Sequence, residues 1–441
     1  MKRIILYSLL ILTPNLSLKA QEVWTLQQCL ETGLSNSLDF QVKQLDILSA
    51  ETVNRNPALE YLPVVNITGS HSYSIGSTID PATNTRVSSN IQSDNFALNA
   101  SMNIVDFNIF TVARRNKIAV LKAKADKEAT AAEYALSILE NYYNVLYTQE
   151  LLKIQQSQFE NAVFNLKRIE KEVAIGSRPK SDLYDMQVIY AQEDNGIITT
   201  RQLLYNQKLI LIQLMNRPDV LPDDLLVENT PLAQTDARPQ SEIFENALRN
   251  YPKITSSQLN EDMARKNIAV QKNYYLPVIQ AYYNYSSFYY LPLKQMGGQQ
   301  VNPFWTQITD NKNHYVGLQL NMPVFNGLRT HRDVQLAKIE HQKSVVVKEQ
   351  EKIKLRQTIE QEIAKQQQNT DLALKLEDTR LFAQRSFETT QSKFSSGLVE
   401  AIVFTGSKNQ LLTAEYNLLK AKVTLAYINI KLNYLQFNRF F

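Results

Sequence analysis

Two segments of the chain alternate between apolar and polar side chains, the pattern of a strand with one face in an apolar medium and the other in water. They are residues 96–104 and 314–322. The apolar positions are Phe96, Leu98, Ala100, Met102 and Ile104 in the first segment and Val316, Leu318, Leu320 and Met322 in the second. The polar positions are Asn99, Ser101 and Asn103, then Gly317, Gln319 and Asn321. Residues 61–73 and 278–286 alternate more weakly, so the pattern predicts two pairs of strands.

Long helical patterns account for most of the remaining chain. Residues 109–175 contain neither proline nor glycine and would extend about 100 Å as one helix. Thr25 and Gln28 fit a capping box at the start of the first helix. We predict helices over 25–54, 109–175, 180–216, 241–273, 328–395 and 399–437, with turns at Gly176-Ser177-Arg178-Pro179 and Ser395-Ser396-Gly397.

The helices that follow these two turns each carry an apolar residue at every seventh position. The positions are Leu183, Tyr190, Ile197, Leu204 and Leu211, and then Phe404, Leu411, Leu418, Leu425 and Leu432. An apolar residue at every seventh position is typical of a coiled-coil seam. The turns and seams therefore predict two long coiled-coil hairpins.

The same elements occur twice in the same order. Leu62-Pro63-Val64 recurs as Leu276-Pro277-Val278, 214 residues later. Asn103, Phe107 and Asn108 recur as Asn321, Phe325 and Asn326, and the two seams lie 221 residues apart. This spacing indicates a duplicated unit, with a first repeat over 21–216, a linker over 217–240 and a second repeat over 241–441.

Composition and charge indicate export and argue against some partners. Residues 1–20 resemble a secretory signal, with Lys2-Arg3 before an apolar stretch and Ala20 before the expected cleavage site. The signal contains Lys2, Arg3 and Lys19 and no acid, so its removal changes the formal net charge from +4 to +1. A balanced charge argues against nucleic acid as a partner. Cys29 is the single cysteine, which excludes an internal disulfide, and we expect a buried or half-buried thiol.

The strands have the length of membrane-spanning strands, about nine to eleven residues. No apolar run after the signal is long enough for a spanning helix, which needs about twenty residues. A sheet in lipid must close on itself, and four strands are too few to close a barrel. Strands that span a membrane here would therefore share one barrel among several copies. The alternative is a soluble β-sandwich with a dry core.

In the order of its helices and strands, and in its motifs, the chain resembles the TolC-type outer-membrane efflux channel family. The resemblance covers about residues 22–437 and includes Pro323-Val324-Phe325-Asn326-Gly327 at the exit of the fourth strand. It implies a mixed α+β membrane protein in which the strand pairs join a trimeric, twelve-stranded transmembrane barrel. It also implies a homotrimer in the outer membrane with a long periplasmic helical tunnel. The implied partners are a periplasmic adaptor, an inner-membrane pump and outer-membrane lipid.

The resemblance also implies roles for the hairpin tips. The tip residues that match the adaptor-docking grooves are Gly176, Ser177, Arg178, Gly397, Leu398 and Val399. Acids after the tip glycines narrow the channel in this family, and by position they are Asp182, Asp185 and Glu400. The second tip has Val403 and Gly406 where the family often has acids. Each of the three acids also has a simpler explanation as a solvated acid near a helix start.

The sequence contains no recognisable catalytic, cofactor or metal motif. The histidines His71, His314, His331 and His341 lack the spacing of metal ligands. We therefore expect a passive exit duct for an efflux or secretion system, rather than an enzyme. The alternative is a soluble periplasmic coiled-coil scaffold or adaptor. The cargo, whether drug, metal ion or polypeptide, is left open.

Overall fold

The computed structural model describes residues 22–80, 84–88, 90–229, 238–293 and 301–439. The expected signal peptide, residues 1–20, lies outside these ranges, as does part of the predicted linker. The chain forms two compact units, each built from both predicted repeats. The first comprises residues up to Gln44 with 126–254 and 352–441, and the second comprises 45–125 with 255–351.

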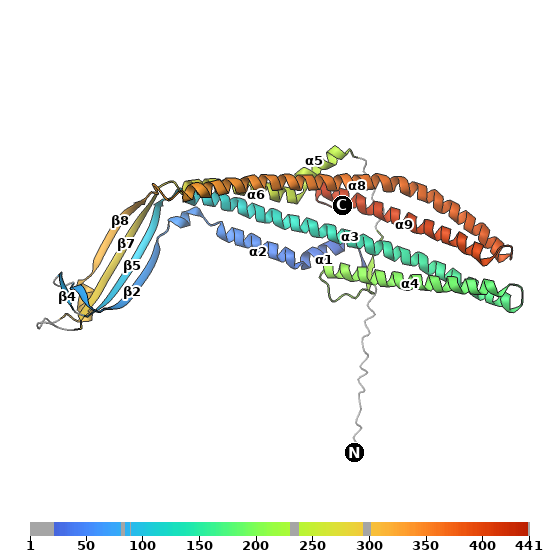
Figure 1. Cartoon of the computed structure of the whole chain (residues 1–441), viewed down its shortest axis with the longest axis horizontal. Coiled ribbons are helices and arrows are strands. Elements are labelled where there is room, and N and C mark those ends of the chain that lie inside the picture. The colour runs from blue at the N-terminus through green and yellow to red at the C-terminus, as the bar shows by residue number, and fades with distance from the viewer. Residues whose placement is uncertain (1–21, 81–83, 89, 230–237, 294–300, 440–441) are drawn as a thin grey trace, which may run out of the picture. The chain divides into compact units, whose positions relative to one another are not determined.

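The second unit contains a four-stranded antiparallel sheet (Figure 1). Its strands, in spatial order, are β2 (Val64–Ser74), β5 (Ile91–Val105), β7 (Val278–Pro292) and β8 (Asn313–Asn321). All four predicted strands are therefore present. Pairing between β5 and β7 joins the two predicted pairs into one sheet, in which β2 and β8 are the edge strands.

One face of this sheet carries uncharged polar groups that bond from strand to strand. Asn284 donates to Asn99 Oδ1 at 2.7 Å, and Asn99 donates to Thr68 Oγ1 at 3.3 Å. Tyr282 lies opposite Gly317 in the pairing of β7 and β8. A Cβ atom on Gly317 would lie 2.4 Å from the Tyr282 hydroxyl oxygen, so the glycine leaves the space in which this ring lies.

The end of the sheet away from the helices carries short elements that the sequence pattern did not reveal. The segments between the two strands of each predicted pair contain β3 (Ser77–Asp80), β4 (Thr85–Ser88) and α7 (Phe304–Asp310). Phe304 packs edge-on against Phe96 and Tyr289. Gln307 bonds both backbone groups of Tyr290, each at 3.0 Å. Phe304 therefore packs against aromatic rings of β5 and β7.

Four helices continue from the second unit into the first, namely α2 (Leu38–Val53), α3 (Phe107–Ala174), α6 (Pro252–Asn273) and α8 (Arg329–Ser395). A short 3₁₀ helix, η1 (Pro57–Tyr61), precedes β2. The long uninterrupted helices 109–175 and 328–395 are confirmed within a few residues. Among the described residues, none of the helices has a stretch of sufficient length and hydropathy to cross a membrane.

Two predicted helices are interrupted, so those predictions were wrong in detail. The helix expected over 25–54 is two helices, α1 (Leu26–Asn36) and α2, because Ser37 is extended and its hydroxyl accepts from Phe40 N at 3.3 Å. The helix expected over 241–273 is α5 (Gln240–Asn250) followed by α6. Here Tyr251 is extended because the ring of Pro252 disfavours a helical conformation in the preceding residue.

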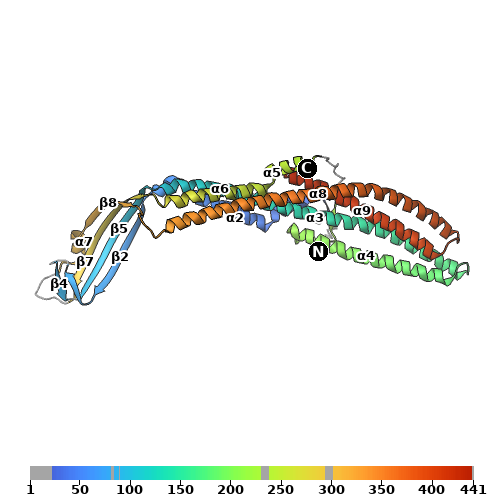
Figure 2. The same cartoon turned by 45° about the horizontal axis from the view of Figure 1, so that its top comes forward.

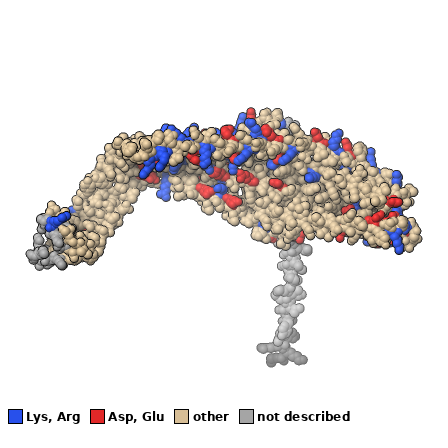
Figure 3. Space-filling model, in the orientation of Figure 1, with Lys and Arg blue, Asp and Glu red and all other residues tan. Residues whose placement is uncertain are grey.

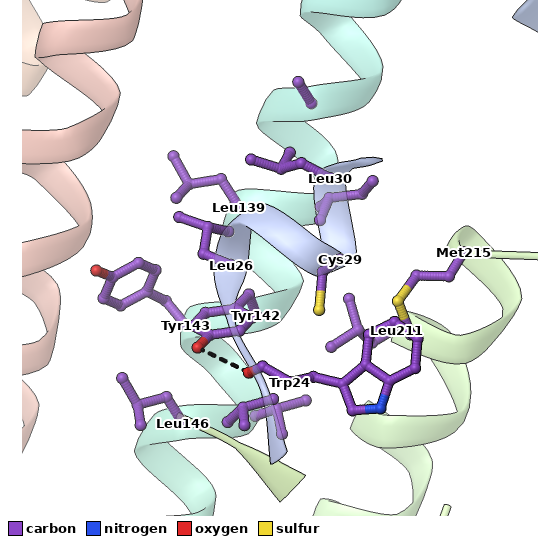
Figure 4. Close-up of a cluster of buried hydrophobic side chains, with 14 of the residues drawn as sticks. Trp24, Leu26, Cys29, Leu30, Leu139, Tyr142, Tyr143, Leu146, Leu211 and Met215 are labelled. Carbon is purple, nitrogen blue, oxygen red and sulfur yellow. Dashed lines mark hydrogen bonds between the residues drawn. The ribbon is translucent and has the colours of Figure 1, made fainter. Parts of the chain in front are cut away.

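The first unit has its main core where α1, α3 and α4 (Lys180–Leu214) meet (Figure 4). Thr25 and Gln28 form the predicted capping box at the start of α1. Two short parallel strands, β1 (Glu22–Trp24) and β6 (Leu225–Val227), lie beside this core, and β6 falls within the predicted linker. The Tyr142 hydroxyl approaches the carbonyl oxygens of Glu228 at 2.7 Å and Trp24 at 3.2 Å, which connects α3 to both strands.

Cys29 lies within this core and is completely buried, as predicted. Burial raises the pKa of its thiol to about 12, since the thiolate would lose its hydration. The cysteine therefore remains a neutral packing group at physiological pH.

The predicted seams of α4 and α9 (Ala401–Phe437) are largely buried in the first unit. Ile197 and Leu211 are 4% and 0% exposed, and Phe404 and Leu432 are 2% and 3% exposed. One ion pair crosses between the two helices. Lys408 donates to Glu193 Oε1 at 2.9 Å, and their side chains are 4% and 13% exposed. A buried pair of this kind fixes the register of α4 against α9, because a shift would leave both charges without partners.

Replacing Tyr142 with phenylalanine tests the connection between α3 and the two short strands. We expect Tyr142→Phe to lower the free energy of unfolding of the helical part by about 1–2 kcal/mol, because a buried hydrogen bond is lost. The measurement is chemical denaturation followed by circular dichroism. Tyr205→Phe on the exposed face of α4 is the control and should have little effect. Equal stabilities for the two variants would contradict this role.

Candidate functional site

Both hairpins end in the same kind of glycine turn. Gly176 and Gly397 have positive φ values of 77° and 73°. Each glycine and the residue after it donate to carbonyls of the preceding helix. Ser177 N bonds Glu172 O, and Leu398 N bonds Lys393 O, both at 2.9 Å. This is the Schellman arrangement, which requires a left-handed residue and therefore favours glycine. The two turns lie side by side at one end of the first unit (Figures 1 and 2).

Arg178 joins the first tip to the second. Its Nε lies 2.8 Å from Glu172 and its Nη1 donates to Asp182 at 2.9 Å. Its Nη2 donates to the carbonyl oxygen of Phe394, which belongs to the other hairpin. The guanidinium also lies over the Phe394 ring, 4.5 Å from the ring centre. With 8% of the side chain exposed, this arginine is a buried connection between the hairpins.

An aromatic cluster lies directly beneath this arginine. Phe394 of α8 stacks on Phe404 of α9, with ring centres 4.6 Å apart. Both rings are almost fully buried, and they pack against Ile169 and Met186 of the first hairpin. The two tips therefore share one small core, and Arg178 closes it with charge and cation–π attraction.

The three acids predicted to narrow the channel lie in different environments. The Asp182 residue is 6% exposed, and its carboxylate accepts from Arg178. Asp185, one turn further along α4, is exposed. Glu400 is also exposed, at the N-cap position of α9, and its side chain makes no capping hydrogen bond. Asp182 and Arg178 thus form a pair within the chain, whereas Asp185 and Glu400 face solvent.

The residues predicted to contact an adaptor also divide into two groups. Leu398 is 74% exposed, and Ser177 is exposed although its hydroxyl donates to Glu172 O at 2.8 Å. Val399 is half-buried against the aromatic cluster, and Arg178 is turned inward. Gly176 and Gly397 are exposed and shape the turns.

Three further apolar residues are exposed at the tips. They are Ile175, which is 80% exposed, Ile402, which is 67% exposed, and Val403, which is 51% exposed. Their signal in the sequence was an apolar residue directly before the turn glycine and two others at the start of the following helix. Ile175 and Leu398 lie on different hairpins. The sequence alone therefore does not show that both are exposed at neighbouring turns.

Substitution of Arg178 tests the connection between the tips. We expect Arg178→Gln to reduce protection of the tip amides against hydrogen exchange by roughly 2–4 kcal/mol, because two carboxylates lose their buried partner. Arg178→Lys should restore only part of this protection, since one ammonium cannot reproduce the three directed bonds of the guanidinium. Arg201→Gln, on an exposed part of α4, is the control. Unchanged exchange around Phe394 in Arg178→Gln would contradict this assignment.

Comparison with known proteins identifies the family. The sequence model described as "Outer membrane efflux protein" matches residues 29–217 and 243–434. No curated protein sequence matches the chain.

Among solved structures, the chain is similar in fold to CusC, with a TM-score of 0.77, 17% identity, and coverage of 93% of this chain and 91% of CusC. It is also similar to the CmeC outer membrane channel of Campylobacter jejuni, with a TM-score of 0.76, 16% identity and coverage of 93% and 85%. For VceC of Vibrio cholerae the TM-score is 0.75 at 14% identity, with coverage of 93% and 96%. The family match spans most of the sequence and the fold agrees with it: the chain belongs to the outer membrane efflux protein family.

Proposed function

We propose that the chain forms the exit duct of a tripartite efflux or secretion system. In this system an inner-membrane pump and a periplasmic adaptor deliver cargo to the duct, which carries it through the outer membrane. The observation that carries the proposal is the four-stranded sheet, which has one apolar face and one uncharged polar face and continues into long helical hairpins. A sheet of this kind fits lipid on one side and water on the other.

A homotrimer with a twelve-stranded barrel would complete this sheet. The edge strands β2 and β8 have no partner on their outer sides within the described sheet. Unpaired backbone groups are costly in lipid, so each edge needs a strand from another copy. Three copies of four antiparallel strands would supply every edge with a partner and leave a lumen lined by amides and hydroxyl groups.

Exposed apolar stripes on the helices support the same assembly. On α8, Ile339, Val346 and Ile353 lie seven residues apart, and each is more than half exposed. On α2, Leu38, Val42 and Leu45 follow helical spacing and are 66%, 53% and 63% exposed. Stripes of this size favour burial against another helix. We propose that α8 of one copy packs against α2 of the next.

The tips would form the gate and the docking surface. Asp185 and Glu400 are exposed acids near the turns, so three copies would surround a narrow axis with carboxylates and favour cations. Asp182 would act through Arg178 to hold the two tips together. The exposed Ile175 and Leu398 offer an apolar surface to an adaptor, with Ser177 at its margin.

The order of the chain's segments is part of the same proposal. Residues 1–20 would be removed on export, and residues 21–216 and 241–441 would be two copies of one ancestral unit joined by 217–240. A soluble coiled-coil scaffold is less favoured, because it has no use for a sheet with one apolar face.

Single-channel recording tests the duct and its constriction together. We expect the purified protein to form channels in planar lipid bilayers that prefer cations. In Asp185→Asn with Glu400→Gln, the ratio of cation to anion permeability should fall by roughly twofold or more, because each change removes one charge per copy from around the axis. The matched control is Asp371→Asn with Glu128→Gln, two exposed acids far along the sequence from either turn. If the protein forms no channels, the proposed duct is wrong. If the selectivity is unchanged in the double variant, only the proposed role of Asp185 and Glu400 in the constriction is wrong.

Photo-crosslinking in living cells tests the docking surface. A photoreactive residue at Ser177 or Leu398 should capture a periplasmic adaptor, identified by mass spectrometry, because both side chains are exposed at the turns. The same residue at Lys375, exposed in the middle of α8, is the control and should capture far less adaptor. If both tip sites, at normal expression, capture nothing but further copies of this chain, the tips are not a docking surface.

A further inference from the structure

All four connections between the sheet and the helices repeat one order of side chains. Large apolar or aromatic residues lie next to the strand, and cations follow them on the helix side. The residues next to the strands are Leu59 and Leu62 before β2, Phe107 and Phe110 after β5, Tyr274 and Tyr275 before β7, and Val324, Phe325 and Leu328 after β8. The cations beyond them are Arg55, then Arg114 and Lys117, then Lys272, then Arg329 and Arg332.

The apolar residues of these connections are unusually exposed. Val324 and Phe325 are 92% and 81% exposed, and Phe110 and Tyr274 are each 55% exposed. Exposure of so many large apolar groups in one region marks a surface that another apolar medium covers. A purely aqueous environment would not stabilise them.

The cations of these connections are exposed too. Further along α3, Lys124 pairs with Glu51 at 2.9 Å. Between Phe107 and Lys124, the start of α3 carries Arg114, Arg115, Lys117, Lys122 and Lys124 and no acidic residue. Figure 3 shows Lys and Arg side chains over the sheet-proximal ends of the helices, next to a sheet whose visible face is nearly free of charge.

The nearby acids are mostly engaged. Asp106 accepts from Asn108 N at 2.8 Å, and Asp333 pairs with Arg332 at 3.0 Å. Glu60 is exposed and remains available to water. Arg114, Lys117, Lys272 and Arg329 are all exposed and form the cationic part of the surface that we call the junction belt.

The spacing along α3 places the apolar and cationic groups at different depths on one face. Phe110, Arg114, Lys117 and Leu121 are separated by four, three and four residues, which keeps them on the same side of a helix. At about 1.5 Å per residue, the two cations lie roughly 6 and 10 Å beyond Phe110 along the helix. The headgroup layer on each side of a bilayer core is about 5–8 Å thick. An aromatic ring at the edge of the hydrocarbon therefore puts the Arg114 backbone at the level of the phosphates. Lys117 begins just beyond that level, and its long side chain can reach back to it, because helical side chains lean toward the N-terminus.

We propose that the junction belt binds anionic phospholipid headgroups at the periplasmic surface of the outer membrane. The proposal rests on the membrane position of the sheet in the proposed function. Apolar and aromatic groups contact the ends of the acyl chains, and the cations contact phosphate oxygens. The helices α3 and α8 also begin at this level, so the positive ends of their dipoles add to the field of the cations.

Two other occupants fit the observations less well. Cations that lined the water-filled lumen would need no exposed apolar neighbours. An anionic cell-wall polymer would satisfy the cations and leave Val324 and Phe325 in water. A phospholipid satisfies both kinds of group at once.

Native mass spectrometry of the full-length protein tests the proposal. Protein in mild detergent is titrated with phosphatidylglycerol and, separately, with phosphatidylethanolamine, and the bound lipids are counted. We expect the natural protein to bind phosphatidylglycerol more tightly. The affinity for phosphatidylglycerol should be at least about fivefold lower in the variant Arg114→Gln, Lys117→Gln, Lys272→Gln, Arg329→Gln. Loss of one surface cation alone weakens binding to an anionic lipid by about that factor.

The matched control removes two arginines and two lysines elsewhere. These are Arg201→Gln, Lys375→Gln, Arg385→Gln and Lys420→Gln, all exposed in the first unit. This variant should retain the preference for phosphatidylglycerol. Equal binding of the two lipids by the natural protein, or equal losses in both variants, would overturn the proposal.

Recordings in planar bilayers from the same preparations separate the belt from the duct. If the natural protein forms no channels, the proposed function fails. If the natural protein forms channels but binds the two lipids equally, only the proposed binding of anionic phospholipid by the junction belt is refuted. If the belt variant keeps its lipid preference and its permeability shifts toward cations, the four side chains line the lumen, and the lipid assignment is wrong.

Discussion

Backbone hydrogen bonding at the two edges of the sheet is the constraint on which the proposed assembly depends. Within the described part of one chain, β5 and β7 are paired on both sides, while β2 and β8 each have one side without a strand. In water such edges can be solvated, but in hydrocarbon they cannot. The four strands of one chain therefore pair in a defined register, but they do not close into a barrel by themselves. The exposed apolar stripes of α2 and α8 belong to the helices that connect to these same edge strands, so strands and helices would be completed by the same neighbour.

The distribution of charge divides the molecule into regions with different tasks. The polar face of the sheet bonds through neutral amides and hydroxyl groups, such as Asn99 and Asn284, and so adds no charge where a lumen would lie. Charge is concentrated in the helices. It is buried and paired where Lys408 of α9 meets Glu193 of α4. At the tips, Arg178 pairs with Asp182 and also donates to Phe394 of the other hairpin. Exposed cations such as Arg114 lie near the sheet. Near the turns, the exposed acids Asp185 and Glu400 are accompanied by exposed lysines such as Lys180.

The contact between the tips depends on a few short-range interactions. The shared core is small and consists chiefly of Phe394, Phe404 and a few aliphatic side chains. Arg178 adds three directed bonds that are strong while buried and weaken once water enters. Loss of one arginine contact would expose the others to water.

The element types and their order could be predicted from the sequence, because an apolar period of two in strands and of seven in helices is a local pattern. The sequence located the four strands, the two glycine turns and the seams, and the motifs were sufficient to indicate the family. It did not reveal the breaks at Ser37 and Tyr251, the small strands β1 and β6, or the helix α7, since each depends on single hydrogen bonds or one proline. The pairing of β5 with β7 and the bond from Arg178 to Phe394, a residue 216 positions away, became apparent only in the folded chain. Contacts of that separation leave no periodic trace in a single sequence, because they depend on how two hairpins pack and not on the spacing within either one.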